Sequence, residues 1–290
     1  MIPSAPRSGS GSRSTPAQAL RVLQAEYRFK FKRSLGQHFL IDPRALDGIV
    51  HALAPAPGET VIEVGPGAGF LTERLLETGA RVVAVEVDPV MAGMLARHTG
   101  APATLRIVNA DILETDLGRL LADSGAKSCK VAGNLPYQIT SPVLFKFLAE
   151  RDLVGRMVFT VQREVGVRMA SGPGSKDYGA LSVAVAYASR CENLFGIAPS
   201  AFVPPPQVRS VVVRLSPLPR RLTAGREAAL FRIVRAAFGQ RRKMLVNSVA
   251  EAAGGKEAAA AALAAAGVDG ARRGETLTLD EFERLAEKLG

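Results

Sequence analysis

The chain has 290 residues, of which 47% are apolar and 22% are charged, which is the composition of a globular protein. This composition excludes wholesale disorder, a collagen-like repeat and a disulfide-rich mini-protein. Lys and Arg number 37 against 27 for Asp and Glu, giving a net charge of +10. The excess favours a polyanionic partner such as nucleic acid, although a merely solvated basic surface has the same net charge.

The two cysteines, Cys129 and Cys191, belong to no C-x-x-C motif and no Cys/His cluster. We therefore expect no metal site and no disulfide framework, which fits the reducing conditions of the cytoplasm. The apolar stretches are far shorter than the roughly 20 residues that a membrane span requires. The sequence thus predicts a protein that does not enter a membrane.

Residues 1–25 are predicted to form a disordered tail, because the N-terminal stretch is rich in Ser, Gly, Pro and Arg and has no acidic residue before Glu26. Transit peptides have a similar composition. Import of the protein into an organelle by this tail is therefore an alternative.

Short Val/Ile runs alternate with helical stretches from residue 61 onward, at 61–64, 81–87, 105–111, 130–134 and 157–162. This βαβ pattern predicts an α/β fold with a mostly parallel sheet, over residues 26–216. The β-rich runs 181–188 and 208–215 are joined by a Pro-rich loop and predict an antiparallel hairpin at one edge. Residues 217–290 are rich in Ala, Leu, Arg and Glu, including an Ala run at 258–266, and predict a small helical domain.

A glycine loop, Gly65-Pro66-Gly67-Ala68-Gly69, directly follows a predicted strand and precedes a predicted helix that begins near Phe70. Glycines allow a tight turn and close approach of a ligand to the backbone, and the helix N-terminus offers free N–H donors. The last glycine of a dinucleotide fingerprint is replaced by Phe70, which disfavours a bound pyrophosphate.

Three polar residues stand at the ends of the next three predicted strands: Glu86, Asp111 and Asn134. Carboxyl ends of parallel strands meet at one edge, where open α/β sheets bind ligands. An acid after the second strand suits a ribose diol, and an acid or amide after the third suits an adenine amine. Taken alone, Asp111 could equally be a helix cap or a surface acid.

The fourth strand ends in Asn134-Leu135-Pro136-Tyr137, a segment suited to chemistry on an exocyclic base amine. The Asn134 side-chain oxygen and a backbone carbonyl can accept the amine hydrogens and so localise the nitrogen lone pair. Pro136 stiffens the turn, and Tyr137 offers a flat face to a base that has left its helix. The alternative is an Asn-Pro turn with a core tyrosine.

Two further residues could border the ligand. Phe202, in a Pro-rich loop, could present its ring to the other side of the target base, or it could be a core residue that anchors the loop. His38 precedes the first helix of the α/β region and could border the ligand, although a lone histidine is more often structural.

Two basic regions are candidates for contact with RNA phosphates. The first lies at the start of the α/β region, and the second is one face of a helix predicted from Phe231 to about Val249, although either could be a solvated surface. The predicted RNA-binding residues are Lys30, Lys32, Arg33, Arg232, Arg235, Arg242 and Lys243.

From about residue 30 to the end, the chain resembles the bacterial small-subunit ribosomal RNA adenine dimethyltransferase family. The resemblance rests on several long motifs in the same order, among them SLGQHFLID (34–42), VIEVGPGAGFLT (61–72), GNLPYQITSPVLFKFL (133–148), FVPPPQVRSVVVRL (202–215) and FGQRRKML (238–245).

The resemblance implies a Rossmann-like methyltransferase domain followed by a small helical domain. It implies S-adenosylmethionine as methyl donor, without a metal, and dimethylation of two adjacent adenosines in the 3′-terminal hairpin loop of 16S RNA. The expected substrate is the 30S subunit or its precursor, and we expect the enzyme to be a monomer in the cytoplasm.

Residue roles follow from the resemblance by position. Tyr137 and Phe202 match the aromatic positions around the target base, and many relatives have Asn where this chain has His38. Together with the glycine loop, the expected cofactor-binding residues are His38, Leu40, Gly65, Gly67, Glu86, Asp111 and Asn134.

Two alternatives remain open from the sequence. The related enzymes that methylate an adenine of large-subunit RNA and confer macrolide resistance share the glycine loop and the Asn-Leu-Pro-Tyr segment. A non-catalytic RNA-binding factor of ribosome assembly could keep the same fold, but such a protein is expected to have eroded cofactor positions, whereas Gly65, Glu86, Asp111 and Asn134 are all suitable here.

Overall fold

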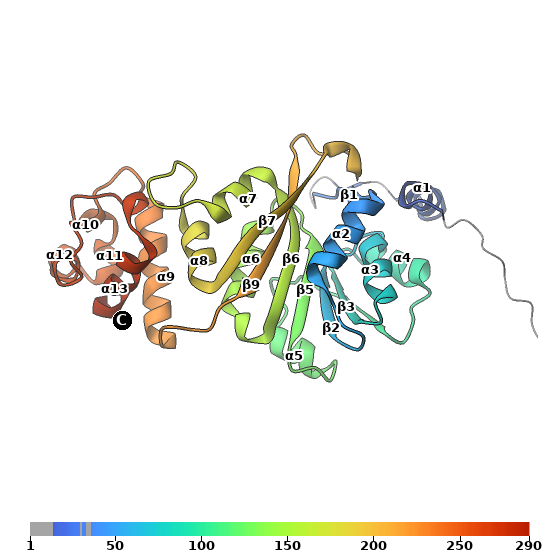
Figure 1. Ribbon diagram of the computed structural model, residues 1–290, viewed down its shortest axis with the longest axis horizontal. Helices are drawn as coiled ribbons and strands as arrows, with labels where there is room; N and C mark the ends of the chain where they lie inside the picture. The colour runs from blue at the N-terminus through green and yellow to red at the C-terminus, as the bar shows by residue number, and fades with distance from the viewer. Residues whose placement is uncertain (1–13, 30, 33–35, 290) are drawn as a thin grey trace, which may run out of the picture.

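The structure is a computed structural model that describes residues 14–29, 31–32 and 36–289. A seven-stranded sheet with the order β4-β3-β2-β5-β6-β9-β7 forms its centre (Figure 1). Strands β4 to β6 in this order run parallel to one another, and β9 pairs antiparallel with both β6 and β7. The predicted Rossmann-like sheet with an antiparallel edge is thus confirmed. The strands are β1 (Phe39–Leu40), β2 (Thr60–Val64), β3 (Arg81–Glu86), β4 (Leu105–Asn109), β5 (Cys129–Asn134), β6 (Val154–Gln162), β7 (Ser189–Ile197), β8 (Phe202–Val203) and β9 (Ser210–Pro217).

Helices cover the sheet and continue beyond its β7 edge into a C-terminal group (Figure 1). None of the helices in the described parts of the chain is long and apolar enough to cross a membrane. The α-helices are α1 (Pro16–Tyr27), α2 (Pro43–Leu53), α3 (Phe70–Glu77), α4 (Pro89–Thr99), α5 (Leu117–Ala122), α6 (Thr140–Ala149), α7 (Arg163–Ala170), α8 (Ala180–Ala188), α9 (Ala224–Gly239), α10 (Leu245–Ser248), α11 (Ala250–Ala253), α12 (Lys256–Ala265) and α13 (Leu279–Leu289).

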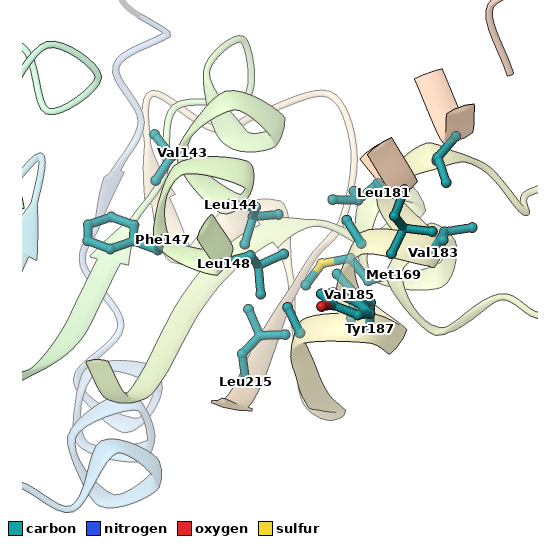
Figure 2. Close-up of a cluster of buried hydrophobic side chains, with 14 of the residues drawn as sticks. Val143, Leu144, Phe147, Leu148, Met169, Leu181, Val183, Val185, Tyr187 and Leu215 are labelled. Carbon is teal, nitrogen blue, oxygen red and sulfur yellow. The ribbon is translucent and has the colours of Figure 1, made fainter. Parts of the chain in front are cut away.

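The hydrophobic core has two parts. One packs α1 to α4 against the sheet, and the other packs α5 to α8 against it and extends into the C-terminal helices. Figure 2 shows the second part, where Leu148 of α6, Met169 of α7 and Tyr187 of α8 lie near Leu215 of β9. Because both faces are covered, β2 is buried along its whole length, which explains its largely apolar sequence.

The prediction of a strand at 181–188 is wrong, because these residues form α8 and the partner of β9 is the following segment, β7. A short run that is apolar throughout does not distinguish a buried strand from a buried helix. Here Leu181, Val183 and Val185 are all buried, so no polar face marks the helical period. The predicted antiparallel edge exists, but it is displaced along the chain.

The prediction of a disordered tail over residues 1–25 is wrong for its last part, since α1 begins at Pro16. Thr15 caps this helix by accepting from the backbone N–H of Gln18, and the Gln18 side chain accepts from the Thr15 N–H. Leu20 and Leu23 are buried against the core. Residues 1–13 lie outside the described residues.

The predicted helix over 231–249 is wrong in its boundaries. Helix α9 begins earlier, at Ala224, and ends at Gly239, so that Arg242 and Lys243 lie in the turn before α10. Glycine has a low helix propensity, which is consistent with an end at this position. The Ala-rich run does form a helix, α12, as predicted.

A buried ionic network joins α9 to the α/β region. The Arg151 guanidinium is 2% exposed and donates to both carboxylate oxygens of Glu227, at 2.9 and 3.2 Å. Tyr187 and Arg220 also donate to Glu227. Burial raises the pKa of the Glu227 carboxyl, but the hydrogen bonds and charges of Arg151 and Arg220 outweigh it and hold the pKa below its usual value.

Candidate active site

A cavity of about 220 Å³ opens at the carboxyl ends of β2, β3 and β5. Strand order turns at this place, since β3 and β4 lie on one side of β2 while β5 and β6 lie on the other. Such a switch point is where open α/β sheets bind ligands. With the exception of Phe202, all the residues predicted for the cofactor and the target amine line the cavity: His38, Leu40, Gly65, Gly67, Glu86, Asp111, Asn134, Leu135, Pro136 and Tyr137.

The glycine loop forms one wall of the cavity and requires glycine for two different reasons. Gly65 has a φ of +64°, in the left-handed region that favours glycine. Gly67 also has a positive φ, and a Cβ there would lie 2.8 Å from the ring of Phe39. The ring of Phe39 therefore packs directly on the loop backbone and joins β1 to the cavity wall.

Glu86, at the end of β3, holds the glycine loop in place. One carboxylate oxygen accepts from the Gly67 N–H at 3.1 Å, and the other accepts from the Asp88 N–H at 2.9 Å. The residue is 6% exposed, and burial raises the pKa of its carboxyl against these hydrogen bonds. Since a carboxylate has about four acceptor positions, it can still accept from a ribose hydroxyl.

Asp111, just beyond β4, also lines the cavity. One of its carboxylate oxygens accepts from the Leu113 N–H at 2.8 Å, so the residue caps a local turn. The capping role and the predicted ligand role are therefore compatible, because the second oxygen has no part in that hydrogen bond.

Glu63 of β2 lines the cavity and was not among the residues predicted from the sequence. It is 1% exposed, and burial raises the pKa of its carboxyl to about 8, although a hydrogen bond from the Thr72 hydroxyl opposes the shift. Glu63 is the only charged residue of β2, a strand that is buried along its whole length. That departure from the apolar pattern was the signal available in the sequence.

The segment before β1 is bonded to Asp88, a second residue that the sequence did not indicate. Asp88 caps α4, and its N–H donates to Glu86. The Lys32 ammonium lies 2.9 Å from the Asp88 carboxylate, whose side chain is fully buried. The Gln37 amide donates to the same carboxylate at 3.3 Å and accepts from the Lys32 N–H. Lys32, predicted to contact RNA, is thus paired with a buried acid.

The Asn134 side chain has a defined orientation. Its Nδ2 donates to the backbone carbonyl of His38 at 2.7 Å. Since a carbonyl can only accept, the amide nitrogen must face His38 and the side-chain oxygen must point elsewhere. No donor to this oxygen is found among the described residues, so it can accept a hydrogen from a ligand.

Tyr137 is held at both ends of its side chain. Its hydroxyl is 2.9 Å from the Ser210 Oγ on β9, and its ring lies against the His38 imidazole, with ring centroids 5.6 Å apart and planes 27° from parallel. Burial raises the pKa of the Tyr137 phenol, so it is neutral near pH 7. The residue is half-buried and lines the cavity, as a stacking surface for a base requires.

Phe202 does not reach the cavity. It is 2% exposed, pairs through β8 with Leu40 of β1, and belongs to the core that packs α1 to α4 against the sheet. The expectation that its ring faces the target base is therefore wrong for this structure. The alternative left open by the sequence, a core residue that anchors the Pro-rich loop, describes its position.

The predicted RNA-binding residues fall into three groups, apart from Lys32. Lys30 and Arg33 lie outside the described residues. Arg232 is exposed, but its guanidinium donates to the backbone carbonyls of Ala252 and Leu289. It therefore caps the C-terminal ends of two helices. Three further cations have exposed side chains: Arg235, Arg242 and Lys243. No ion-pair or hydrogen-bond partner of these side chains is found among the described residues.

The loop between α7 and α8 is rich in Gly and Ser, yet it is fastened to the C-terminal helices. Gly174 N–H donates to the Glu275 carbonyl, and Tyr178 donates from its hydroxyl to the Leu277 carbonyl. Arg241 donates to the Lys176 carbonyl and to the Glu275 carboxylate. In Figure 1 this loop, α7 and β1 all lie along the upper edge of the molecule.

Comparison with known proteins agrees with this geometry. The family model described as ribosomal RNA adenine dimethylase matches residues 28–289. The chain belongs to this family. The resemblance found in the sequence is thereby confirmed, and membership makes the chain a ribosomal RNA adenine methyltransferase that uses S-adenosylmethionine.

Curated relatives are similar over nearly the whole chain. A protein of Alkaliphilus oremlandii named ribosomal RNA small subunit methyltransferase A is 42% identical over 280 residues, covering 95% of this chain and 97% of the relative. A protein of the same name from Geobacter metallireducens is 43% identical over 261 residues, covering 89% of this chain and 95% of the relative.

Two solved structures share the fold. A dimethyladenosine transferase from Plasmodium falciparum has a TM-score of 0.72 and 24% identity, covering 86% of this chain and 96% of that one. The 23S rRNA methyltransferase ErmE has a TM-score of 0.63 and 24% identity, covering 87% of this chain and 99% of that one. At this identity the likeness concerns the fold alone.

Proposed function

We propose that this methyltransferase dimethylates the N6 amines of two adjacent adenosines in the 3′-terminal hairpin loop of 16S rRNA, within the 30S subunit or its precursor. The observation that carries the proposal is that Glu86, which holds the glycine loop, and the Asn134–Tyr137 segment line one cavity. Relatives about 40% identical are named small-subunit methyltransferases, which supports this choice of RNA. The same proposal has the protein act as a monomer in the cytoplasm, where bacterial ribosomes assemble.

The residues that line the cavity fit S-adenosylmethionine. Glu86 suits the ribose hydroxyls, Asp111 suits the adenine amine, and Val87, half exposed at the cavity wall, suits the face of the adenine ring. Glu63 lies at the wall as a buried acid that a cationic ligand can stabilise in its charged form. When bound, the donor supplies an electrophilic methyl group carried on positively charged sulfur.

The Asn134–Tyr137 segment positions the target amine. The Asn134 side-chain oxygen is free to accept one amine hydrogen, because its Nδ2 is engaged by His38. The Pro136 carbonyl already accepts from the Ile139 N–H and the Thr140 hydroxyl. We therefore assign the second amine hydrogen to the carbonyl of Leu135, which lies between these residues and also lines the cavity.

No strong base is needed for the transfer, because the methylated ammonium is acidic enough to lose its proton to water. The neutral Tyr137 phenol is suited to stacking rather than to proton removal. The rate enhancement then comes mainly from alignment of the amine with the methyl group, which contributes on the order of 7 kcal/mol in favourable cases.

The helical part, residues 217–290, is proposed to hold the RNA. Arg235 at the outer face of α9 and the turn that carries Arg242 and Lys243 are exposed and basic. The Arg241 guanidinium donates to the Lys176 carbonyl, so the α7–α8 loop that carries Lys176 lies against the helical part. Phosphate contacts of this kind fix the orientation of an RNA without reading its sequence.

The test is to incubate the protein with tritiated S-adenosylmethionine and unmethylated 30S subunits, and then to map the label. We expect label on two adjacent adenosines of the 3′-terminal hairpin loop. Naked 23S RNA is the matched substrate for the large-subunit alternative. Label on 23S RNA alone, or at any other 16S position, would overturn the proposal, and binding to 30S subunits without transfer would favour the assembly-factor alternative.

A further inference from the structure

Ser210 is a buried polar residue at the start of β9, a strand whose other buried residues are apolar. It is 2% exposed, and a hydroxyl that is removed from water costs free energy unless it forms a hydrogen bond. The partner found for it in the described part of the chain is the Tyr137 hydroxyl, 2.9 Å from the Ser210 Oγ. The polar exception in this strand therefore contacts the proposed acceptor site.

The bond between Ser210 and Tyr137 reaches across one strand of the sheet. Tyr137 follows β5 and Ser210 begins β9, while β6 lies between these two strands (Figure 1). Side chains two residues apart in a strand share a face. Val212 packs on the side of α1 to α4, so Ser210 lies on that face of β9. Ala132 packs on the same side, so Asn134 lies on that face of β5. The bond therefore holds Tyr137 on the face of the sheet that also carries Asn134.

Ser210 stands at the end of the Pro-rich segment that Phe202 begins. Phe202 is buried in the core and does not line the cavity. Ser210 pairs with Gln162 of β6 on one side and with Ile197 of β7 on the other. Its hydroxyl is thus presented by a strand that is paired on both sides, and a group on such an element is held more precisely than a group on a loop.

The Tyr137 hydroxyl is the atom of this side chain that lies farthest from the backbone. A hydrogen bond at this atom limits the swing of the ring about the Cα–Cβ bond, because both ends of the side chain are then held. The position of the ring decides how a stacked base lies relative to the Asn134 side-chain oxygen. Small misplacements of reacting groups are costly in a transfer reaction.

We propose that Ser210 is a positioning residue of the acceptor site, whose hydroxyl anchors the Tyr137 hydroxyl and fixes the position of the ring on which the target base stacks. This inference rests on the proposed function, since it concerns the placement of the target base. Ser210 is not among the residues that line the cavity. Its effect is therefore on the transfer step and leaves the affinity for the donor unchanged.

The first test compares Ser210→Ala with the wild-type protein, using unmethylated 30S subunits and tritiated S-adenosylmethionine. The substitution removes only the hydroxyl, and kcat is expected to fall by about 3- to 10-fold, the effect expected from loss of one hydrogen bond. The dissociation constant for S-adenosylmethionine, from titration calorimetry, should not change. Thermal unfolding checks that each variant is folded at the temperature of the assay.

Ser189→Ala is the matched control. Ser189 is a buried serine of β7 whose hydroxyl donates to the Val185 carbonyl, and it pairs with Pro217 at the opposite end of β9 from Ser210. Its replacement should leave kcat unchanged. An unchanged kcat of Ser210→Ala, whatever the change in its unfolding temperature, would mean that the hydroxyl is only structural and would overturn the proposal. Weaker donor binding by Ser210→Ala would overturn it as well.

A double-mutant cycle tests whether Ser210 acts through Tyr137. Tyr137→Phe removes the other half of the hydrogen bond but keeps the ring, and it should lower kcat by a similar factor. The double variant should be no more than about twofold slower than the slower single variant, because the effects of two groups that act through one bond are not additive. Losses that multiply, or a wild-type kcat in Tyr137→Phe, would contradict the proposal. Lack of transfer by the wild-type protein would instead refute the proposed function.

Discussion

The side-chain amide of Asn134 donates to the backbone carbonyl of His38 at 2.7 Å, so the end of β5 is tied to the segment just before β1. This bond joins two parts of the chain that are far apart in sequence. It leaves the Asn134 side-chain oxygen directed away from the His38 carbonyl. The geometry of one hydrogen bond thus decides which atom of the side chain can meet the target amine.

Asn134→Ala should lower kcat by about 100-fold or more, as expected when a preorganised hydrogen-bonding group that acts on the reacting centre is removed. Donor affinity should remain mostly intact, because Glu86 and Asp111 still line the cavity. Single-turnover labelling of 30S subunits measures the first quantity, and titration calorimetry the second. The matched control is Asn193→Ala, since Asn193 of β7 donates to the Gly166 carbonyl of α7 and should leave transfer unchanged. Unchanged turnover of the Asn134 variant would refute the proposed amine contact.

The convergence of three site residues could be predicted because it depends on topology alone. Glu86 and Asn134 end two strands of one parallel sheet and Asp111 lies just beyond a third, so their convergence requires only the βαβ pattern and the strand ends. Gly65 and Gly67 were likewise identified by the turn that they must form.

The local structures that were wrong depend on tertiary contacts. The run from Leu181 to Ala188 has no polar face, because α8 is packed into the core along most of its surface. Helix α1 is stabilised by burial of Leu20 and Leu23, a tertiary contact, although the start of the helix has a local signal in the capping box of Thr15 and Gln18.

The direction of a side chain could not be predicted either. Phe202 stands at the start of the Pro-rich sequence expected of a base-contacting loop, but its pairing with Leu40 turns the ring into the core. Arg232 shares a helix face with Arg235 in sequence, yet its guanidinium closes the ends of helices that follow α9 along the chain. Both outcomes depend on long-range partners.

Replacing Arg235 and Arg242 together with Ala should weaken RNA binding and reduce the slope of log K against log salt. The expected change in slope is about 1.4 to 1.8, at roughly 0.7 to 0.9 for each phosphate that is no longer neutralised. Filter binding of the 16S hairpin RNA over a salt series measures it, and donor affinity should not change. Arg232→Ala is an informative control, because the Arg232 guanidinium caps two helix C-termini. Its loss should lower the stability of the protein more than it changes the salt slope. An unchanged slope in the double variant would remove α9 from the RNA surface.

Glu63 should make stability depend on pH in the absence of donor. Burial raises the pKa of its carboxyl to about 8, above the value of 4.5 for the unfolded chain, so the folded protein holds a proton that the unfolded chain releases between these pH values. The contribution is fully present below pH 4.5 and is lost as pH rises through 8, with a slope of up to about 1.4 kcal/mol per pH unit.

Glu63→Gln should remove this dependence, because the amide remains neutral and can still accept from Thr72. Urea unfolding from about pH 5 to about pH 9 measures the difference between variant and wild type across the titration range. Glu114→Gln is the matched control at an exposed position and should keep the wild-type dependence. Between these pH values, the free energy of unfolding of the wild type should fall relative to that of Glu63→Gln. If it does not fall, the pKa of Glu63 is not raised.

The Arg151–Glu227 pair should be essential for stability, because it lies buried between α9 and the α/β region. Glu227→Gln leaves the Arg151 guanidinium without a charged partner in a buried site, which costs about 3–5 kcal/mol of unfolding free energy. Urea unfolding measures this loss. Asp123→Asn, at the exposed Arg106–Asp123 pair, is the matched control and should cost less than about 1 kcal/mol. Equal effects of the two substitutions would mean that the buried pair contributes no more than a surface pair, and that apolar packing alone holds the helical part against the sheet.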